Sequence, residues 1–189
     1  MSNPTHPTVP SNAELPKSVN PYRLAEQNVT LEGEVPLAAL SRFRDAVFAL
    51  DGGEVCQVRL TFGRDRERRY QVEGTLDARV TVECQRCMGP MPHPLTSEFR
   101  LGLVISDEQA QQLPRDLEPF LTDEDAADLW TLVEDELLLI LPPFPLHERS
   151  ECPAGADVEA LEAEAASADE TPPAENPFSV LAELKKTKH

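Results

Sequence analysis

The sequence predicts an α+β fold, with an antiparallel sheet that is open or barrel-like, two main helices and a short C-terminal helix. Several segments alternate apolar and polar residues with a period of two, which is the pattern of strands buried on one face. A single longer segment, residues 129–141, instead repeats its apolar residues at helical spacing. With 189 residues the chain is long enough for one domain with tails. We place that domain at residues 21–152.

The alternating segments define the expected strands. They are residues 28–35, 55–62, 69–76, 78–84, 95–105 and, less regular, 117–121. The loop at residues 88–94 contains one glycine and three prolines, which favour a reversal of the chain. We therefore expect Cys84 and Cys87 to lie at the tip of a β-hairpin.

Two main helices are expected. Pro36 is a suitable first residue for a helical segment that extends to about residue 49. The stronger helix occupies about residues 126–141, where Asp128 can cap the amino end and Pro142 stops the helix. Residues 106–114 predict one short capped turn between these helices.

The two ends of the chain differ from the domain in composition. Residues 1–20 are rich in Pro, Ser and Asn and are expected to be a disordered lead. Residues 153–175 have almost no large apolar side chain and are expected to form an acidic flexible linker. Residues 176–189 then predict a short helix, whose apolar side chains are candidates for docking on this domain or on a partner: Phe178, Leu181 and Leu184.

The net charge is −17, and nearly all of it lies in the second half. Residues 1–100 carry 12 basic against 13 acidic residues, and residues 101–189 carry 5 against 21. This balance argues against non-specific binding to phosphates, but permits a local basic surface or a basic protein partner. No apolar segment of about 18 residues and no signal peptide is found, so we expect a cytoplasmic protein with no membrane contact.

Cys84-Gln-Arg-Cys87 is the first candidate site. A CxxC turn can present two thiolates to one zinc ion, and His147 and Cys152 are the nearest residues that could complete four ligands. Because the chain has a single CxxC, the alternative is that these cysteines are ordinary reduced thiols. A redox role would require the motif at the start of a helix, whereas this motif follows a strand. Apart from this possible zinc ion, no cofactor is expected.

A second candidate site is a concentration of arginines after residue 58. Arginine is well suited to phosphate contacts. The RNA-binding candidates are Arg64, Arg66, Arg68, Arg69, Arg79 and Arg86. Asp65 and Glu67 interrupt the series, so the alternative interpretation is a solvated turn.

Four segments occur together in one order. They are Val80-Thr-Val-Glu-Cys-Gln-Arg-Cys87, Ser106-Asp-Glu-Gln-Ala110, Leu132-Val-Glu-Asp-Glu-Leu137 with Leu141-Pro142 and Pro145-Leu-His147, and Asn176-Pro-Phe-Ser-Val-Leu-Ala182. In this order they resemble the bacterial YceD family of large ribosomal RNA subunit accumulation proteins. The resemblance implies a cytoplasmic protein that supports the synthesis, processing or stability of 23S ribosomal RNA. It implies no catalytic residue.

We therefore expect a non-catalytic ribosome biogenesis factor whose partner is large-subunit rRNA or a pre-ribosomal particle. The alternative is an acidic module or chaperone that binds a basic ribosomal protein and affects rRNA indirectly. A zinc-binding or nuclease-type enzyme ranks last, because the sequence lacks the carboxylate-rich and histidine-rich set that such sites need. No small-molecule substrate is expected.

Overall fold

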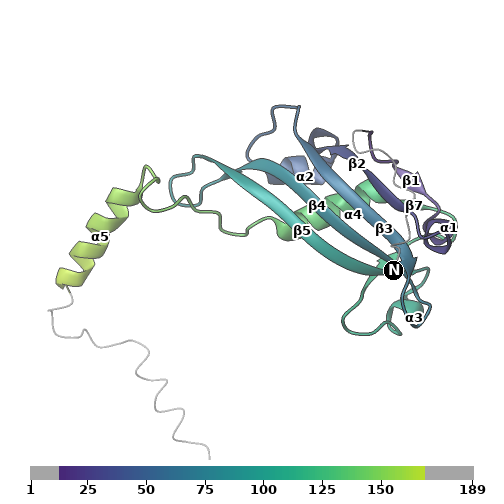
Figure 1. Cartoon of the computed structure of the whole chain (residues 1–189). Helices are drawn as coiled ribbons and strands as arrows, with labels where there is room; N and C mark the ends of the chain where they lie inside the picture. Colours follow the sequence, from purple (N-terminus) through teal and green to yellow (C-terminus); the bar gives the residue numbers. More distant parts are fainter. Residues whose placement is uncertain (1–12, 169–189) are drawn as a thin grey trace, which may run out of the picture. The chain divides into compact units, whose positions relative to one another are not determined.

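A computed structural model describes residues 13–168. Residues 13–145 contain a five-stranded sheet, and Figure 1 labels its strands β2, β3, β4 and β5. The order is β2-β3-β4-β5-β6, with only the β5–β6 pair parallel. The strands are β2 (Thr30–Pro36), β3 (Val55–Arg64), β4 (Tyr70–Glu83), β5 (Pro90–Val104) and β6 (Glu118–Leu121). The expected α+β fold is confirmed, and the sheet is open and does not close into a barrel.

The β4–β5 hairpin is the longest pairing in the sheet. It extends from Gln71 opposite Gly102 to Glu83 opposite Pro90. The two strands expected at residues 69–76 and 78–84 are one continuous strand, because Asp77 between them points to the exposed face and does not interrupt the ladder. The return strand begins at Pro90, five residues earlier than expected. Its prolines are tolerated because β6 pairs only with residues 101–104, which leaves this end of β5 as an edge.

Helix α4 (Leu129–Ile140) confirms the stronger predicted helix. The Asp128 side chain caps it, since Oδ1 accepts hydrogen bonds from the Trp130 N–H at 2.9 Å and the Thr131 N–H at 3.0 Å. Its buried side chains pack into one core with those of the strands. Figure 1 shows α4 and α2 on the same side of the sheet.

The helix expected at residues 36–49 is wrong as a single element. The segment forms a 3₁₀ turn, η1 (Leu37–Ala39), an extended Leu40 and then the short helix α2 (Ser41–Ala46). Helix α2 begins where Glu134 of α4 accepts main-chain hydrogen bonds at Oε1, from Arg42 at 2.7 Å and from Phe43 at 3.2 Å. The capping group thus comes from a distant part of the chain, so local periodicity could not locate this start.

The disorder expected over residues 1–20 is wrong for residues 13–20, and residues 1–12 lie outside the described part. Leu15 is only 1% exposed, its N–H donates to the Glu34 carbonyl and its carbonyl accepts from Trp130 Nε1. Strand β1 (Ser18–Val19) pairs with β7 (Ala127–Asp128), and helix α1 (Pro21–Glu26) follows. All these contacts join residues that are far apart in sequence.

The short turn expected after Ser106 is confirmed as helix α3 (Asp107–Ala110), capped by the Ser106 side chain. Helix α5 (Gly155–Ala168), described by itself, occupies much of the segment expected to be a flexible linker at residues 153–175. Alanine and glutamate favour the helix, although the segment has few apolar groups to bury. Arg149 forms a two-point ion pair with Glu162, with Nη–Oε distances of 2.6 and 3.1 Å.

The predicted C-terminal helix at residues 176–189, with its docking candidates, lies outside the described residues and stays a prediction. Within residues 13–168, no helix has the length and apolar character needed to cross a membrane.

Replacing Glu134 tests the joint between α2 and α4. Glu134 is buried, and Oε2 also accepts from Arg42 Nε at 2.9 Å. We expect Glu134→Ala to lower the free energy of unfolding by about 2–3 kcal/mol, because charge-assisted hydrogen bonds are lost. The control Asp135→Ala removes the half-exposed ion pair with Arg42 and should cost less than about 1 kcal/mol in urea denaturation. Equal losses would contradict this assignment.

Two neighbouring glutamates should respond to pH in opposite directions. Burial acts to raise the pKa of Glu134, but hydrogen bonds from Phe43 and Arg42 outweigh it and lower the pKa, so its stabilising effect exists at neutral pH and disappears in acid. Burial raises the pKa of Glu136, with Glu118 and Asp135 adding repulsion, so its ionised form opposes folding at neutral pH.

Glu134→Gln should therefore lower the unfolding free energy at pH 7, and Glu136→Gln should raise it. The Glu136→Gln difference should shrink as the pH falls toward the usual glutamate value of 4.5, and the Glu134→Gln difference should shrink as the pH falls below that value. Denaturant titrations at several pH values measure this, and a destabilised Glu136→Gln variant at pH 7 would overturn it.

Candidate functional site

The CxxC segment forms the loop between β4 and β5, at the hairpin tip where the sequence placed it. Two main-chain hydrogen bonds close the loop, from the Cys84 N–H to the Gly89 carbonyl at 2.9 Å and from the Met88 N–H to the Cys84 carbonyl at 2.8 Å. Met88 has a φ of 57°, a left-handed conformation that is unfavourable for a residue with a side chain. The turn therefore holds Cys84 and Cys87 in a defined arrangement.

The two other predicted ligands follow a segment that is attached to this loop. The Gln85 N–H donates to the Pro145 carbonyl at 2.9 Å, and His147 comes two residues later. A compact turn then sets Cys152, whose N–H donates to the Glu148 carbonyl at 3.0 Å. Gly155 continues this turn, where a Cβ atom would lie 2.1 Å from the Arg149 carbonyl oxygen, so a larger residue does not fit.

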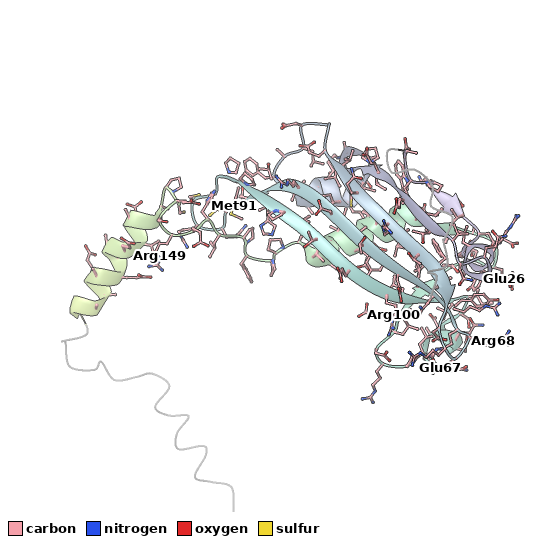
Figure 2. The ribbon with its side chains drawn as sticks, in the orientation of Figure 1. Glu26, Glu67, Arg68, Met91, Arg100 and Arg149 are labelled. Atoms are coloured by element: carbon pink, nitrogen blue, oxygen red, sulfur yellow. The ribbon has the colours of Figure 1, made fainter. Side chains whose placement is uncertain are left out.

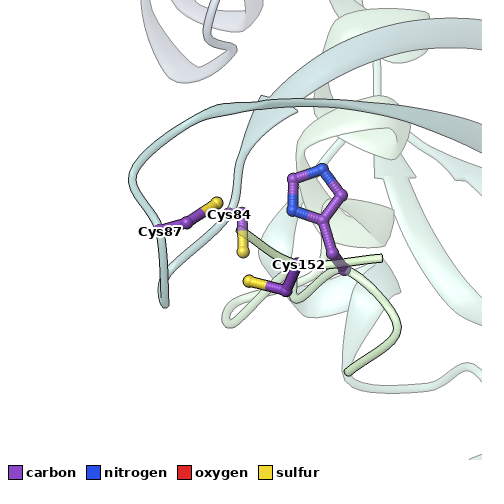
Figure 3. Close-up of side chains that lie close together, drawn as sticks. Cys84, Cys87 and Cys152 are labelled. Atoms are coloured by element: carbon purple, nitrogen blue, oxygen red, sulfur yellow. The ribbon is translucent and has the colours of Figure 1, made fainter. Parts of the chain in front are cut away.

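The predicted ligands fall in two units of the chain, each described by itself. At the hairpin tip, which Figure 3 draws, Cys84 is buried and Cys87 is partly buried. In the unit that begins at residue 146, Cys152 is buried and His147 is partly buried. Three sulfur ligands and one imidazole are a donor set that suits zinc, and this set of four ligands stays a prediction.

Cys56 is the cysteine that is not among the predicted ligands. It lies on the core face of β3, and burial raises the pKa of its thiol to about 12. A thiol with that pKa stays protonated at neutral pH, so Cys56 has a structural role in the core.

The arginine candidates do not form one surface. Arg64, Arg66, Arg68 and Arg69 surround the turn between β3 and β4, whereas Arg86 lies in the loop at the opposite end of β4. Because β4 has 14 residues at about 3.3 Å each, these ends are roughly 45 Å apart. Figure 2 shows Arg68, Glu67 and Arg100 at one end of the sheet and Met91 toward the other.

Carboxylates pair with two of the four arginines around the β3–β4 turn. Arg64 pairs with Glu26 at 3.2 Å and lies over the Tyr70 ring. Arg69 pairs with Asp65 at 2.6 Å and with Glu67 at 3.0 Å. Arg66 and Arg68 are exposed and have no ion pair with any described residue. The Tyr70 ring also contacts Tyr22 edge-on, with ring centroids 5.0 Å apart.

The exposed face of the sheet is a surface that the sequence reasoning did not single out. Across the strands, Glu32 is opposite Arg59, Glu73 opposite Arg100, and Glu98 opposite Thr75. An open groove of about 440 Å³ lies on this face. This face could have been predicted from the sequence. The period of two that places every second strand side chain in the core places the others on the opposite face. The acidic side chains on this face are Glu32, Glu34, Glu73, Asp77, Glu83 and Glu98, and the basic ones are Arg59, Arg79 and Arg100.

Comparison with known proteins identifies the family. The family model described as large ribosomal RNA subunit accumulation protein YceD matches residues 72–185. The chain belongs to the YceD family. A relative from Haemophilus influenzae, named Large ribosomal RNA subunit accumulation protein YceD, is 32% identical over 174 residues, which cover 92% of this chain and 97% of the relative. No solved structure matches the chain.

The YceD match covers the two candidate sites unequally. It begins at Val72, so it includes the four predicted Cys and His ligands and omits the β3–β4 turn with its arginines. The comparisons thus confirm the resemblance inferred from the ordered segments. Three of these segments lie in or next to β4, α3 and α4, and the fourth lies beyond residue 168.

Replacing Asp65 tests whether the β3–β4 turn is held by its own ion pair. Asp65 accepts from the Arg69 N–H at 2.8 Å and from Arg69 Nε at 2.6 Å. We expect Asp65→Ala to lower the unfolding free energy by about 1–3 kcal/mol. Glu67→Ala, in the same turn but exposed, should stay within about 0.5 kcal/mol of the parent chain in thermal or urea melts. A neutral Asp65→Ala would show that the turn does not depend on this pair.

Proposed function

We propose that this protein supports the accumulation of 23S rRNA of the large ribosomal subunit as a non-catalytic factor, by binding a basic protein of the assembling particle. The membership of the YceD family and the name of the Haemophilus relative support the role in large-subunit rRNA. The observation that carries the mechanism is the acidic face of the sheet, opposite the face that α2 and α4 cover.

Charge along the sheet favours a basic partner. The exposed face carries six acidic side chains against three arginines, and Glu73, Asp77 and Glu98 are all exposed. Within residues 13–145 the helices α2 and α4 cover the other face (Figure 1). A polar face with excess carboxylates repels a phosphate backbone and attracts Lys and Arg side chains.

The distribution of the arginines supports the same mechanism. A direct rRNA interface would need several unpaired cations on one surface. Of the six candidates, Arg64 and Arg69 are neutralised, and Arg79 and Arg86 lie away from the β3–β4 turn. Only Arg66 and Arg68 remain there as exposed and unpaired within the described residues, and two phosphate contacts supply little affinity at physiological salt.

Loss of the protein should reduce 23S rRNA. In a bacterial strain that lacks its own family member, we expect less 23S rRNA and fewer large subunits in a sucrose gradient, with both restored by this chain. Unchanged 23S rRNA and a normal subunit ratio would exclude the proposed function.

Charge reversal on the sheet separates the two mechanisms. We expect Glu73→Lys with Glu98→Lys to fail to restore 23S rRNA and to lose the basic ribosomal protein that crosslinks to the parent chain in cells. The control Asp123→Lys with Glu124→Lys makes the same charge change in the exposed loop after β6, and should behave like the parent chain. Crosslinks to rRNA at Arg66 and Arg68, with rescue lost on Arg66→Glu with Arg68→Glu, would instead establish direct rRNA contact.

A further inference from the structure

Strand β5 has a free edge between its prolines and β6. Residues 96–100 pair with β4 on one side, and within residues 13–145 no strand pairs with them on the other, because β6 pairs only with residues 101–104. In Figure 1, β5 is the last labelled strand beyond β4. An unpaired edge is a template for a further strand, so proteins normally cover or block it.

The register of the hairpin shows which main-chain groups point out from this edge. The Cys84 N–H donates to the Gly89 carbonyl, so odd-numbered residues of β5 bond to β4 and even-numbered residues face outward. The Val104 carbonyl, which accepts from the Thr122 N–H on the β6 side, has the same phase.

The prolines of β5 block one part of this edge and leave the next part open. Pro90, Pro92 and Pro94 occupy outward positions, where proline removes an N–H that an added strand would use. The next outward positions are Thr96 and Glu98, which are exposed and keep their N–H groups. Among the residues that the structure describes, neither N–H has a hydrogen-bond partner.

A buried carboxylate lies beside the same edge. Glu136 of α4 is only 9% exposed and forms no hydrogen bond or ion pair with any described residue. Burial raises the pKa of Glu136, and the charge of Glu118, the first residue of β6, adds repulsion. Glu118 is in register with Leu101, so these carboxylates lie where the free part of β5 ends. Such carboxylates destabilise the free chain and would be stabilised by a cation from a partner.

The outer side of the edge is acidic as well. Glu98 is exposed at the edge itself, and Asp77 and Glu73 are exposed on the neighbouring strand. Arg100 adds little positive charge, because Asp116 pairs with it at 3.0 Å. A residue opposite Glu98 on an added strand would have its Cβ atom about 4.5–5.5 Å away, where Lys or Arg is favoured and a carboxylate is repelled.

We propose that residues 96–100 of β5 bind an extended basic segment of a partner protein as an added strand, with one of its cationic side chains held by Glu136 and Glu118. The inference rests on the proposed function, which supplies the basic partner, and it states how that partner is held. The added strand lies in line with β6, because both occupy the same edge of β5. Main-chain hydrogen bonds provide the attachment, and the carboxylates on both sides select positive charge.

Other occupants fit this edge less well. Antiparallel pairing of two copies of this chain would bring their Glu98 side chains near each other, and the prolines of each strand would remove further hydrogen bonds. The carboxylates repel the phosphates of a nucleic acid. Only a basic segment satisfies both the open N–H groups and the buried Glu136.

Proline at position 96 tests strand addition without a change in charge. Thr96→Pro extends the series of prolines by one outward position, where β4 uses no N–H group. The probe is a synthetic peptide of alternating lysine and threonine, titrated into the full chain at physiological salt. We expect Thr96→Pro to weaken binding by roughly tenfold, whereas Thr96→Val, which keeps the N–H, should stay within about threefold of the parent chain.

Glutamine at position 136 tests the buried carboxylate. We expect Glu136→Gln to weaken binding of the peptide by roughly tenfold or more, although the same substitution raises the free energy of unfolding at pH 7. A merely structural role would not give a variant that is more stable and binds less. The control Glu124→Gln removes the same charge from an exposed loop and should bind within about threefold of the parent chain.

Amide hydrogen exchange locates the contact in the parent chain. We expect the peptide to slow exchange at Thr96 and Glu98 by roughly tenfold or more, because N–H groups that enter a ladder are protected. Exchange in the lysine-free matched peptide, with glutamate at the lysine positions, should stay unchanged. This measurement needs no substitution, so it decides the question even if Thr96→Pro folds poorly.

Several results would overturn the inference. They are a peptide that does not bind, unchanged exchange at Thr96 and Glu98, equal binding by well-folded Thr96→Pro and Thr96→Val, or full binding by Glu136→Gln. Binding that survives these variants but is lost in Glu73→Lys with Glu98→Lys would place the basic segment on the sheet face alone. The proposed function fails separately, if 23S rRNA is unchanged in the strain that lacks the protein.

Discussion

Strands β4 and β5 pair over thirteen positions, from Gln71 opposite Gly102 to Glu83 opposite Pro90. Side chains along a strand alternate between faces, so this register sends Val72 and Val80 into the core and Glu73 to the exposed face. A register slip of one residue would move every side chain of the strand to the opposite face of the sheet. The apolar core, the acidic face and the position of the CxxC loop are therefore three consequences of a single pairing.

The carboxylates of this acidic chain have different roles according to their place in that framework. Glu134, on the core side, accepts the first N–H groups of α2 and joins two helices. Asp65 closes a turn through Arg69. Glu73 and Glu98 have neither role and lie exposed on the outer face. Because internal pairs already use part of the charge, Glu73 and Glu98 are among the carboxylates whose charge stays exposed to solvent on the sheet.

Local periodicity predicted the elements whose contacts repeat along the chain. The strands and α4 belong to this class, and so does the hairpin tip, because Gly and Pro reverse the chain at a definite place. It could not predict the break at Leu40, the burial of Leu15 or the helix α5. The break at Leu40 depends on Glu134 and the burial of Leu15 depends on Trp130, and both partners are distant in sequence. Helix α5 depends on helix propensity without burial. For the same reason a short series of arginines looked like one surface, although the length of β4 separates its ends.

Several residues at the hairpin tip are exposed. Three prolines of β5 and the residues Gln85 and Met88 are exposed there, and β6 does not extend far enough to cover this end of β5. A loop with little core to bury needs another source of order, and two main-chain hydrogen bonds supply part of it, from the Cys84 N–H to the Gly89 carbonyl and from the Met88 N–H to the Cys84 carbonyl. Order at the tip and the charge of the sheet face thus depend on different residues. The family resemblance rested in part on the two cysteines of this loop, whereas the acidic face is formed by alternate residues of the strands.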